Sequence, residues 1–227
     1  MYRLKPFGVL NGREVPLIEL FNDKCAVELL PYGATVRAIR VPDRTGKLTD
    51  ICLGYGELES YRTLDACFGG TIGRCANRIG GARFTIDDRG YRVTANEGEN
   101  CLHGGIEGFH KKLWEFTCEE NAVTFSYTSP DGEEGFPGAV RVEVTYRLID
   151  NQLTITYKAA AEQSTVVNLT NHTLQFGRPQ QRHSGGSCAD PAGQPVYAHG
   201  RRKYPSGDAG AGGGNAAGFP DTCGIWE

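Results

Sequence analysis

The pattern of apolar and polar positions along the chain is dominated by short runs that alternate from one residue to the next. Such runs, rich in β-branched and aromatic residues, occur at Leu17–Phe21, Cys25–Leu30, Thr35–Val41, Ala122–Tyr127, Val140–Tyr146 and Leu153–Tyr157. A period of two puts successive side chains on opposite faces, so each run predicts a strand with one buried face. Turn formers separate the runs, and the best helical candidate is one turn around Leu58 to Leu64. The pattern predicts an all-β domain of antiparallel strands, a sandwich or a barrel.

A long glycine-rich stretch from Gly69 to Trp114 lies between the two groups of runs. It carries polar side chains suited to chemistry, and glycine lets the backbone approach a ligand closely. Loops on a rigid sheet are also common places for sites. No helical pattern follows Gly70–Gly73, so this segment is not a phosphate loop.

The composition changes after Thr173. Residues 1–173 contain 19 of the 31 glycines, and the 54 residues from Leu174 onward contain the other 12. The later segment has only three branched aliphatic residues, Leu174, Val196 and Ile225. So little apolar area does not offset the entropy of ordering the chain. We therefore expect a β-domain over residues 1–173 and a disordered tail over residues 174–227.

Charge and cysteine spacing exclude several classes of function. The formal net charge is -3 and the basic residues are scattered, so we expect no nucleic-acid surface. The eight cysteines stand singly, and no C-x-x-C pair predicts a zinc ribbon or a redox motif. Neither a signal-peptide segment nor a membrane-spanning run is present, so we expect a cytoplasmic protein without a membrane partner. Small-molecule chemistry fits this composition best.

Four motifs of the chain, taken in order, resemble the signatures of the aldose 1-epimerase, or galactose mutarotase, family. They are Gly73–Ile79, Asn100–Gly105, Asp131–Gly138 and Val167–His172. Four ordered motifs are far more specific than any one of them. The resemblance covers residues 1–173 and implies a galactose-mutarotase-like antiparallel β-sandwich, or supersandwich, that is incomplete at its C-terminal end.

The resemblance also implies a chemistry and its residues. Interconversion of α and β anomers needs a base for the anomeric hydroxyl proton and an acid for the ring oxygen, with no metal or organic cofactor. By similarity, His172 is the catalytic acid and His103 a second catalytic residue, while Arg78 and Asn77 bind the sugar. The implied partner is a small aldose such as glucose or galactose. The sequence specifies neither the preferred sugar nor an oligomeric state.

Each of these residues also has a structural interpretation. Arg78 pairs with an acid such as Asp87 or Asp88, Asn77 caps a turn, and both histidines are satisfied polar groups. Their joint occurrence at motif spacing favours the functional interpretation. His110, followed by Lys111 and Lys112, is expected on a solvated loop face. Glu133 and Glu134 are expected to point in different directions, in a turn that shapes the rim of the site.

The resemblance stops in frame at Thr173. The family motif continues as Tyr-Phe-Asn-Leu-Ala-Gly, whereas this chain continues as Leu174–Pro179. If each tail codon is read one nucleotide late with a free choice of wobble bases, Leu174–Pro179 becomes FNLAGP. In the same way, Asp208–Pro220 becomes TLAPVEGTPLDFR, which resembles a downstream family signature. We therefore expect a net loss of two nucleotides near Thr173, so that the tail resembles the family only in a shifted reading frame.

This reading predicts that the chain as given is inactive. By family likeness the general base is a glutamate beyond position 227, and the tail offers no counterpart to it. Two alternatives remain open. One is a related epimerase for a sugar phosphate, which requires extra cationic contacts. The other is a non-catalytic carbohydrate-binding β-sandwich.

Overall fold

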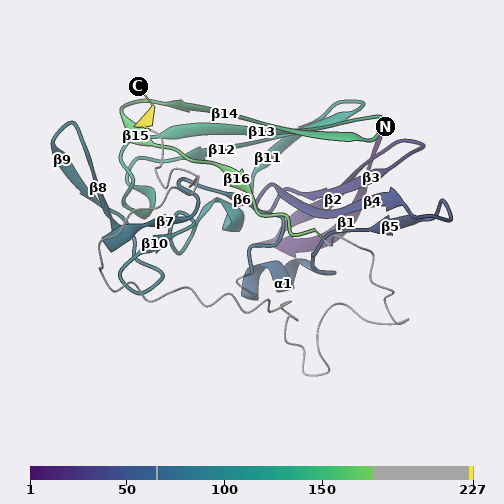
Figure 1. The fold of residues 1–227 in the computed structure, drawn as a ribbon, viewed down its shortest axis with the longest axis horizontal. Helices are drawn as coiled ribbons and strands as arrows, with labels where there is room; N and C mark the ends of the chain where they lie inside the picture. The colour runs from purple at the N-terminus through teal and green to yellow at the C-terminus, as the bar shows by residue number, and fades with distance from the viewer. Residues whose placement is uncertain (65, 176–224, 227) are drawn as a thin grey trace, which may run out of the picture. The chain divides into compact units, whose positions relative to one another are not determined.

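The computed structural model describes residues 1–64 and 66–175, together with the backbone of residues 225 and 226 (Figure 1). Two antiparallel sheets account for most of the described strands. Both sheets are meanders, in which each strand pairs with the next one in the chain. The antiparallel arrangement predicted from the alternating runs is therefore confirmed.

The first sheet has five strands in chain order. They are β1 (Tyr2–Leu10), β2 (Arg13–Phe21), β3 (Ala26–Leu30), β4 (Thr35–Pro42) and β5 (Leu48–Asp50). Asn11 and Gly12 connect β1 to β2, and both have positive φ angles, 51° and 78°. Asn-Gly with this geometry is the preferred two-residue hairpin turn, because its twist matches that of the strands. The turn fixes the register in which Leu10 lies opposite Arg13.

The second sheet has four strands, and its central strand shows the alternation most clearly. The strands are β11 (Glu115–Cys118), β12 (Ala122–Ser129), β13 (Val140–Ile149) and β14 (Gln152–Ala161). Along β13 every second residue, starting from Val140, is buried. One face of the sheet is therefore covered and the other is more exposed, as expected for one layer of a sandwich.

Side chains from both sheets form one apolar core. The first sheet contributes Ile18, Leu20, Val27, Leu29 and Val36, and the second contributes Val123, Phe125, Val140, Val142, Val144, Tyr146 and Leu148. Trp114 is fully buried just before β11, and its indole Nε1 donates to the Phe109 carbonyl oxygen at 3.0 Å. A core shared by two antiparallel sheets makes this a β-sandwich.

Short elements fill the segments between and after the two sheets. They are α1 (Leu58–Thr63), β6 (Thr71–Ile72), β7 (Arg78–Ile79), η1 (Gly80–Ala82), β8 (Arg83–Ile86), β9 (Arg89–Arg92), β10 (Cys101–Leu102), η2 (Phe109–Lys111), η3 (Glu133–Gly135), β15 (Thr165–Val166), β16 (Thr170–Asn171) and β17 (Ile225–Trp226). The strands among them pair as β7 with β10, β6 with β16, β8 with β9 and β15 with β17. A second small core, including Cys75, Ile86, Cys101, Phe136 and Val166, lies beneath these elements.

All six runs singled out in the sequence lie in strands, and α1 lies at the predicted helical turn. The sequence pattern missed β1, because this strand shows no alternation of buried and exposed residues. It contains Pro6 and Gly8, and its ladder with β2 shifts between these two residues. Edge strands tolerate proline and bulges, since one row of their backbone groups has no ladder partner.

The described chain continues two residues past the compositional change at Thr173. The Leu53 amide donates to the Leu174 carbonyl oxygen at 3.0 Å, and Gln175 forms an isolated bridge with Cys52. Of the tail, the structure describes only residues 174, 175, 225 and 226. The predicted disorder of the tail therefore stays a prediction. Within the described ranges, no helix has the length and apolar character needed to cross a bilayer.

The outer face of the first sheet carries two buried carboxylates. Glu19 on β2 lies directly opposite Glu28 on β3, and they are 4% and 3% exposed. Arg3 hydrogen-bonds Glu19, and Lys5 Nζ lies 2.9 Å from it, while Arg40 Nη1 lies 2.5 Å from Glu28. Like charges opposite each other destabilise a sheet unless cations neutralise them. The hydrogen bond from Arg3 lowers the pKa of Glu19 to about 2.

Acidification is expected to destabilise the fold through Glu19. Its folded pKa of about 2 lies below the ordinary 4.5, so the unfolded chain takes up the proton first. The stabilisation is present above pH 4.5 and is lost as the pH falls toward 2. Urea unfolding across this range measures the effect. Glu19→Gln should flatten the pH dependence and remove about 1.5 to 3 kcal/mol near neutral pH.

Glu115→Gln is the matched control, because the ion pair of Glu115 with Arg13 is exposed on both sides. It should change the free energy of unfolding by less than about 1 kcal/mol. An unaltered pH dependence in Glu19→Gln would show that Glu19 is not the titrating group.

Candidate functional site

The pairing of β7 with β10 brings Asn77 and His103 together. Asn77 directly precedes β7, His103 directly follows β10, and Arg78 lies opposite Leu102. In an antiparallel ladder the residues just beyond such a pair also face each other. The His103 amide accordingly donates to the Asn77 carbonyl oxygen at 2.9 Å. The Asn77 amide donates to His103 Nδ1 at 3.2 Å.

The second of these hydrogen bonds indicates which ring nitrogen of a neutral His103 carries the proton. Because Nδ1 accepts, a neutral His103 carries its proton on Nε2 and keeps that nitrogen as a donor. Asn77 and His103 both have positive φ angles, 60° and 55°. Asparagine tolerates this region, but histidine adopts it less often, and such conformations cluster at functional sites.

The pairing of β6 with β16 places His172, which directly follows β16, beside His103. The His172 amide donates to the Gly70 carbonyl oxygen at 2.9 Å, and the Gly69 amide donates to the His172 carbonyl oxygen at 3.1 Å. The imidazole rings of His172 and His103 lie edge to face, with centroids 5.2 Å apart. His172 is half-buried, and its Nδ1 is shielded from solvent and has no hydrogen-bond partner among the described residues. Two separate ladders thus converge on one pair of histidines.

Arg78 lies beside this pair and is held by an acid. Its Nε and Nη2 donate to the two carboxylate oxygens of Glu97 at 2.6 and 2.5 Å, and its Nη1 donates to Asn77 Oδ1 at 3.2 Å. The acidic partner is therefore Glu97, whereas the sequence suggested Asp87 or Asp88. The hydrogen bond from Arg78 lowers the pKa of Glu97. Arg78 remains 52% exposed, so its guanidinium faces solvent beside Asn77.

The strand β16, which directly precedes His172, is tied to the sandwich by Tyr146, a residue that the sequence analysis did not single out. Asn171 Nδ2 donates to the Gly69 carbonyl oxygen at 2.8 Å and to the Tyr146 hydroxyl at 3.2 Å. That hydroxyl in turn donates to the Ala34 carbonyl oxygen at 2.6 Å. Tyr146 is fully buried on β13. In the sequence Tyr146 occupies one more apolar position of an alternating run, and its hydroxyl group is the one indication of a polar role.

Arg74 anchors the turn at the rim of the site. It is 2% exposed, and its Nη1 donates to the carbonyl oxygens of Pro137 and Gly138 at 2.8 and 2.7 Å. Its Nη2 donates to Ser129 Oγ at 2.6 Å. A buried guanidinium is costly unless its donors are satisfied. Here Nη1 and Nη2 bind the turn that follows β12, whereas Nε has no hydrogen-bond partner among the described residues.

Glu133 and Glu134 face different surroundings, as predicted. Glu133 accepts a hydrogen bond from Tyr127 Oη at 2.6 Å and lies 2.9 Å from Lys112 Nζ. Burial opposes ionisation of Glu133, but its side-chain hydrogen bonds outweigh burial and lower its pKa. Glu134 instead accepts backbone amides of the loop that carries His103. The two carboxylates therefore do not form a catalytic pair.

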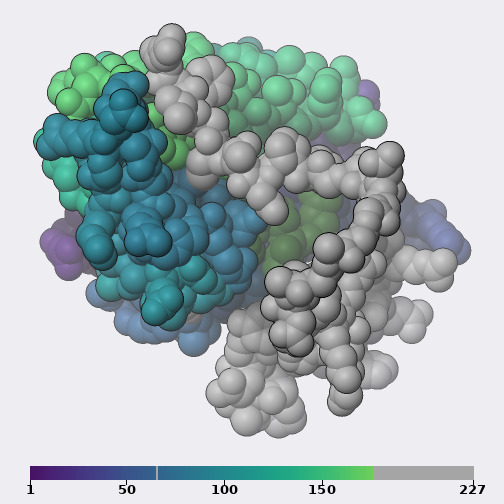
Figure 2. Space-filling model, turned by 60° about the vertical axis from the view of Figure 1, so that its left-hand side comes forward, coloured from purple at the N-terminus to yellow at the C-terminus, as the bar shows by residue number. Residues whose placement is uncertain are grey.

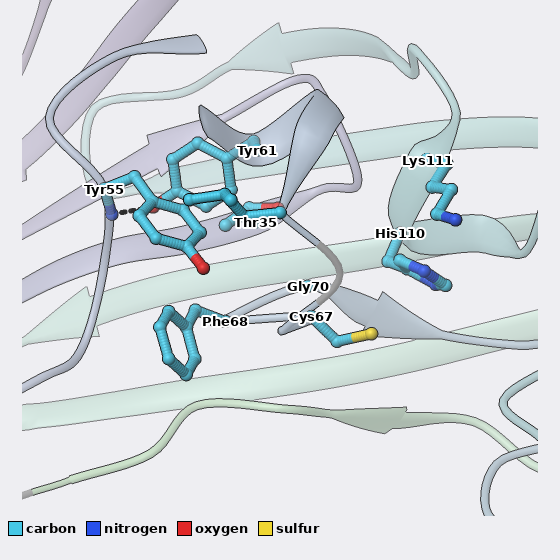
Figure 3. A pocket seen from close by; sticks show the side chains of 9 residues that line it. Thr35, Tyr55, Tyr61, Cys67, Phe68, Gly70, His110 and Lys111 are labelled. Atoms are coloured by element: carbon cyan, nitrogen blue, oxygen red, sulfur yellow. Dashed lines mark hydrogen bonds between the residues drawn. The ribbon is translucent and has the colours of Figure 1, made fainter. Parts of the chain in front are cut away.

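The expectation of a solvated face at His110, Lys111 and Lys112 is wrong, because all three residues are half-buried. His110 and Lys111 line a small hollow with residues of α1 and of the segment before β6 (Figure 3). Side chains added at Gly70 or Gly108 would contact the His110 side chain. The lack of side chains at these glycines leaves room for this histidine.

The candidate site itself is open rather than enclosed. Asn77 and Arg78 are exposed, and His103 and His172 are half-buried. Figure 2 shows the blue-to-teal residues of the segment between the sheets gathered on one face, beside green residues of the second sheet. Among the described residues, no group of three or more histidine, cysteine or acidic side chains is arranged to hold a metal.

Comparison with known proteins gives one consistent family. A family model described as aldose 1-epimerase matches residues 16–176. The chain is 46% identical to galactose mutarotase from Rattus norvegicus over 169 residues, which are 74% of this chain and 49% of the relative. It is 44% identical to galactose mutarotase from Bos taurus over 164 residues, covering 72% and 48%. The chain thus spans about half the length of these relatives.

The fold agrees with this comparison. The crystal structure of an aldose epimerase homologue from C. elegans superposes with a TM-score of 0.69 at 33% identity, covering 71% of this chain and 51% of that one. The galactose-mutarotase-like β-sandwich expected from the sequence is therefore confirmed.

Replacing Arg74 is expected to loosen the rim turn. Arg74→Met fills similar space but leaves the carbonyl groups of Pro137 and Gly138 and the Ser129 hydroxyl without their donor. Unsatisfied buried groups cost about 1 to 3 kcal/mol each, so the free energy of unfolding should fall by roughly 3 kcal/mol or more. Urea denaturation followed by tryptophan fluorescence measures the loss, with the exposed Arg141→Met as control. A loss below about 1 kcal/mol would contradict the anchoring role.

Proposed function

The chain belongs to the aldose 1-epimerase family, and on this basis we propose that its described residues form the acid side of a site that interconverts the α and β anomers of an aldose. The observation that carries the proposal is the convergence of the β7–β10 and β6–β16 ladders on His103 and His172, whose rings lie 5.2 Å apart. No residue of β6, β7, β10 or β16 belongs to the main core of the sandwich, although the nearby Val167, Leu169 and Phe109 pack in it.

The proposed reaction moves two protons and breaks one ring bond. A base takes the proton of the anomeric hydroxyl, the bond between C1 and the ring oxygen breaks, and the acid protonates the ring oxygen. Rotation about the bond between C1 and C2, followed by the reverse steps, closes the ring on the other face. The atoms balance without a redox step, so these two proton transfers need no electron carrier.

We assign the acid role to His172. An imidazole nitrogen can both give and accept a proton, so the ring can act as the acid and be restored in each cycle. The half-buried position of His172 and its shielded Nδ1 restrict competition from water. Its backbone is held at both the amide and the carbonyl by the Gly69 and Gly70 strand, which fixes the ring relative to a bound sugar.

The other three residues are assigned to the sugar. His103 presents Nε2–H as a donor, because its Nδ1 accepts the Asn77 amide. Arg78 offers a planar set of donors that suits neighbouring hydroxyls, with Glu97 fixing its orientation. Asn77 lies between them, and its side-chain oxygen contacts Arg78. In this arrangement His103 is the second catalytic residue and Arg78 and Asn77 bind substrate.

We further propose that the reading frame changes near Thr173. The family match ends at residue 176, close to the point where the sequence departs from the family motif. With a free choice of wobble bases, the tail can be translated back to codons that read as family-like strings one nucleotide late. Resequencing the locus tests this directly. Two additional nucleotides in every read would support the proposal, and an unbroken frame with no family-like codons in the alternative frame would refute it.

Polarimetry with α-galactose and α-glucose tests the activity. We expect little mutarotation by the chain as given and rapid mutarotation when the two nucleotides are restored, because the family's general base lies in the shifted region. In the restored protein His172→Gln should lower the rate by about 10² to 10⁴, the usual contribution of a positioned acid. Full activity in His172→Gln would exclude His172 as the acid.

Glu120→Gln, an exposed change away from the site, is the control and should leave the rate unchanged. Sugar binding without mutarotation in either protein would favour the non-catalytic carbohydrate-binding sandwich. Competition by sugar phosphates but not by free sugars would favour the sugar-phosphate epimerase.

A further inference from the structure

Side chains from outside the loop that carries His103 bind backbone groups on both sides of the histidine. Leu102 ends β10, and His103, Gly104 and Gly105 follow with positive φ angles of 55°, 86° and 105°. Three consecutive residues in this region are costly for the chain, and the histidine carries the largest cost because it has a Cβ. Something outside the loop must therefore stabilise this conformation.

Asn96 binds one side of the loop. Its Oδ1 accepts the Leu102 amide at 2.7 Å, and its Nδ2 donates to the carbonyl oxygens of Leu102 and Gly105, both at 3.0 Å. These three hydrogen bonds bracket His103, since Leu102 precedes it and Gly105 follows it by two residues. One amide side chain thus binds the backbone of the loop both before and after His103.

Glu134 binds the other side. Its carboxylate accepts the Ile106 amide at 3.1 Å and the Glu107 amide at 3.0 Å, one on each oxygen. A side chain at Gly105 would collide with this carboxylate, so glycine there permits the approach. The Glu134 carbonyl oxygen also accepts the Thr94 amide at 2.8 Å, which joins η3 to the segment that carries Asn96. Glu134 has a positive φ angle of 51°, so its own backbone is also constrained.

We propose that Asn96 and Glu134 are positioning residues, which together hold His103 in its left-handed conformation with Nδ1 on the Asn77 amide and Nε2–H directed to substrate. They do not contact the reacting atoms. They act through the loop backbone, and their effect on sugar binding rests on the function proposed above. Their effect on the proton position in His103 does not depend on that function.

The test separates these two effects. Nitrogen-15 spectra of the histidine side chains report which ring nitrogen of neutral His103 carries the proton. The full chain should show one tautomer, with the proton on Nε2. Glu134→Ala should give a mixture of the two tautomers, and Glu134→Gln, which keeps one acceptor oxygen, should lie between the full chain and Glu134→Ala. Asn96→Ala gives the same test from the other side of the loop, should Glu134→Ala fail to fold.

Glu107→Gln is the matched control, because it removes one negative charge from the same loop but leaves the Glu107 amide on Glu134 intact. Its His103 spectrum should equal that of the unaltered chain. In ligand-observed titrations with galactose, Glu134→Ala should weaken binding about tenfold and Glu107→Gln should not. Gly105→Ala, which displaces the carboxylate without changing charge, should reproduce the tautomer mixture.

The outcomes are distinguishable. A tautomer mixture in folded Glu134→Ala or Asn96→Ala supports the positioning role even when no variant binds galactose, in which case only the proposed function fails. A single Nε2–H tautomer in both folded variants overturns the inference, whatever happens to sugar binding. An equal change in Glu107→Gln also overturns it, because the effect would then follow charge rather than the hydrogen bonds.

Discussion

The site depends on one constraint, the antiparallel pairing of strands only two residues long. Such a ladder places the residue before one strand opposite the residue after the other. In β7 and β10 these residues are Asn77 and His103, and His172 directly follows β16, which pairs with β6. Residues almost 70 positions apart in the sequence are thus brought together, with the rings of His103 and His172 5.2 Å apart. Backbone hydrogen bonds form the two ladders, and the side chains of Asn171 and Asn96 hold the segments beside them.

Buried polar groups connect these ladders to the sandwich. Tyr146 joins Asn171 to the second sheet, and Arg74 joins the motif before β7 to the turn after β12. Burial of either group costs free energy unless its hydrogen bonds form. These hydrogen bonds form only while the surrounding backbone stays in place. The same turn supplies Glu134 to the loop of His103. The rim, the loop and the strand ends thus form one connected set of hydrogen bonds, and damage to one part is transmitted to the others.

The sequence revealed the sheets more fully than the details of the site. Alternation exposed β13 because one of its faces is buried and the other is not, whereas β1 escaped notice because none of its residues is buried. The four candidate site residues were proposed from the resemblance of their motifs to the family, and in the structure they lie close together. Their supports were harder to see. Glu97 lies 19 residues from Arg78, and no local pattern marks it as the partner rather than Asp87 or Asp88. His110 looked solvated beside two lysines, but two glycines leave space for its ring.

We propose that His103 and His172 share one sugar site, and a titration of the chain with galactose tests this. The side-chain signals of its five histidines are followed by nitrogen-15 spectroscopy, with assignments from single His→Gln variants. The signals of His103 and His172 should shift together and saturate at the same galactose concentration. Saturable galactose binding that leaves both signals unmoved, or that moves them with different affinities, would contradict it.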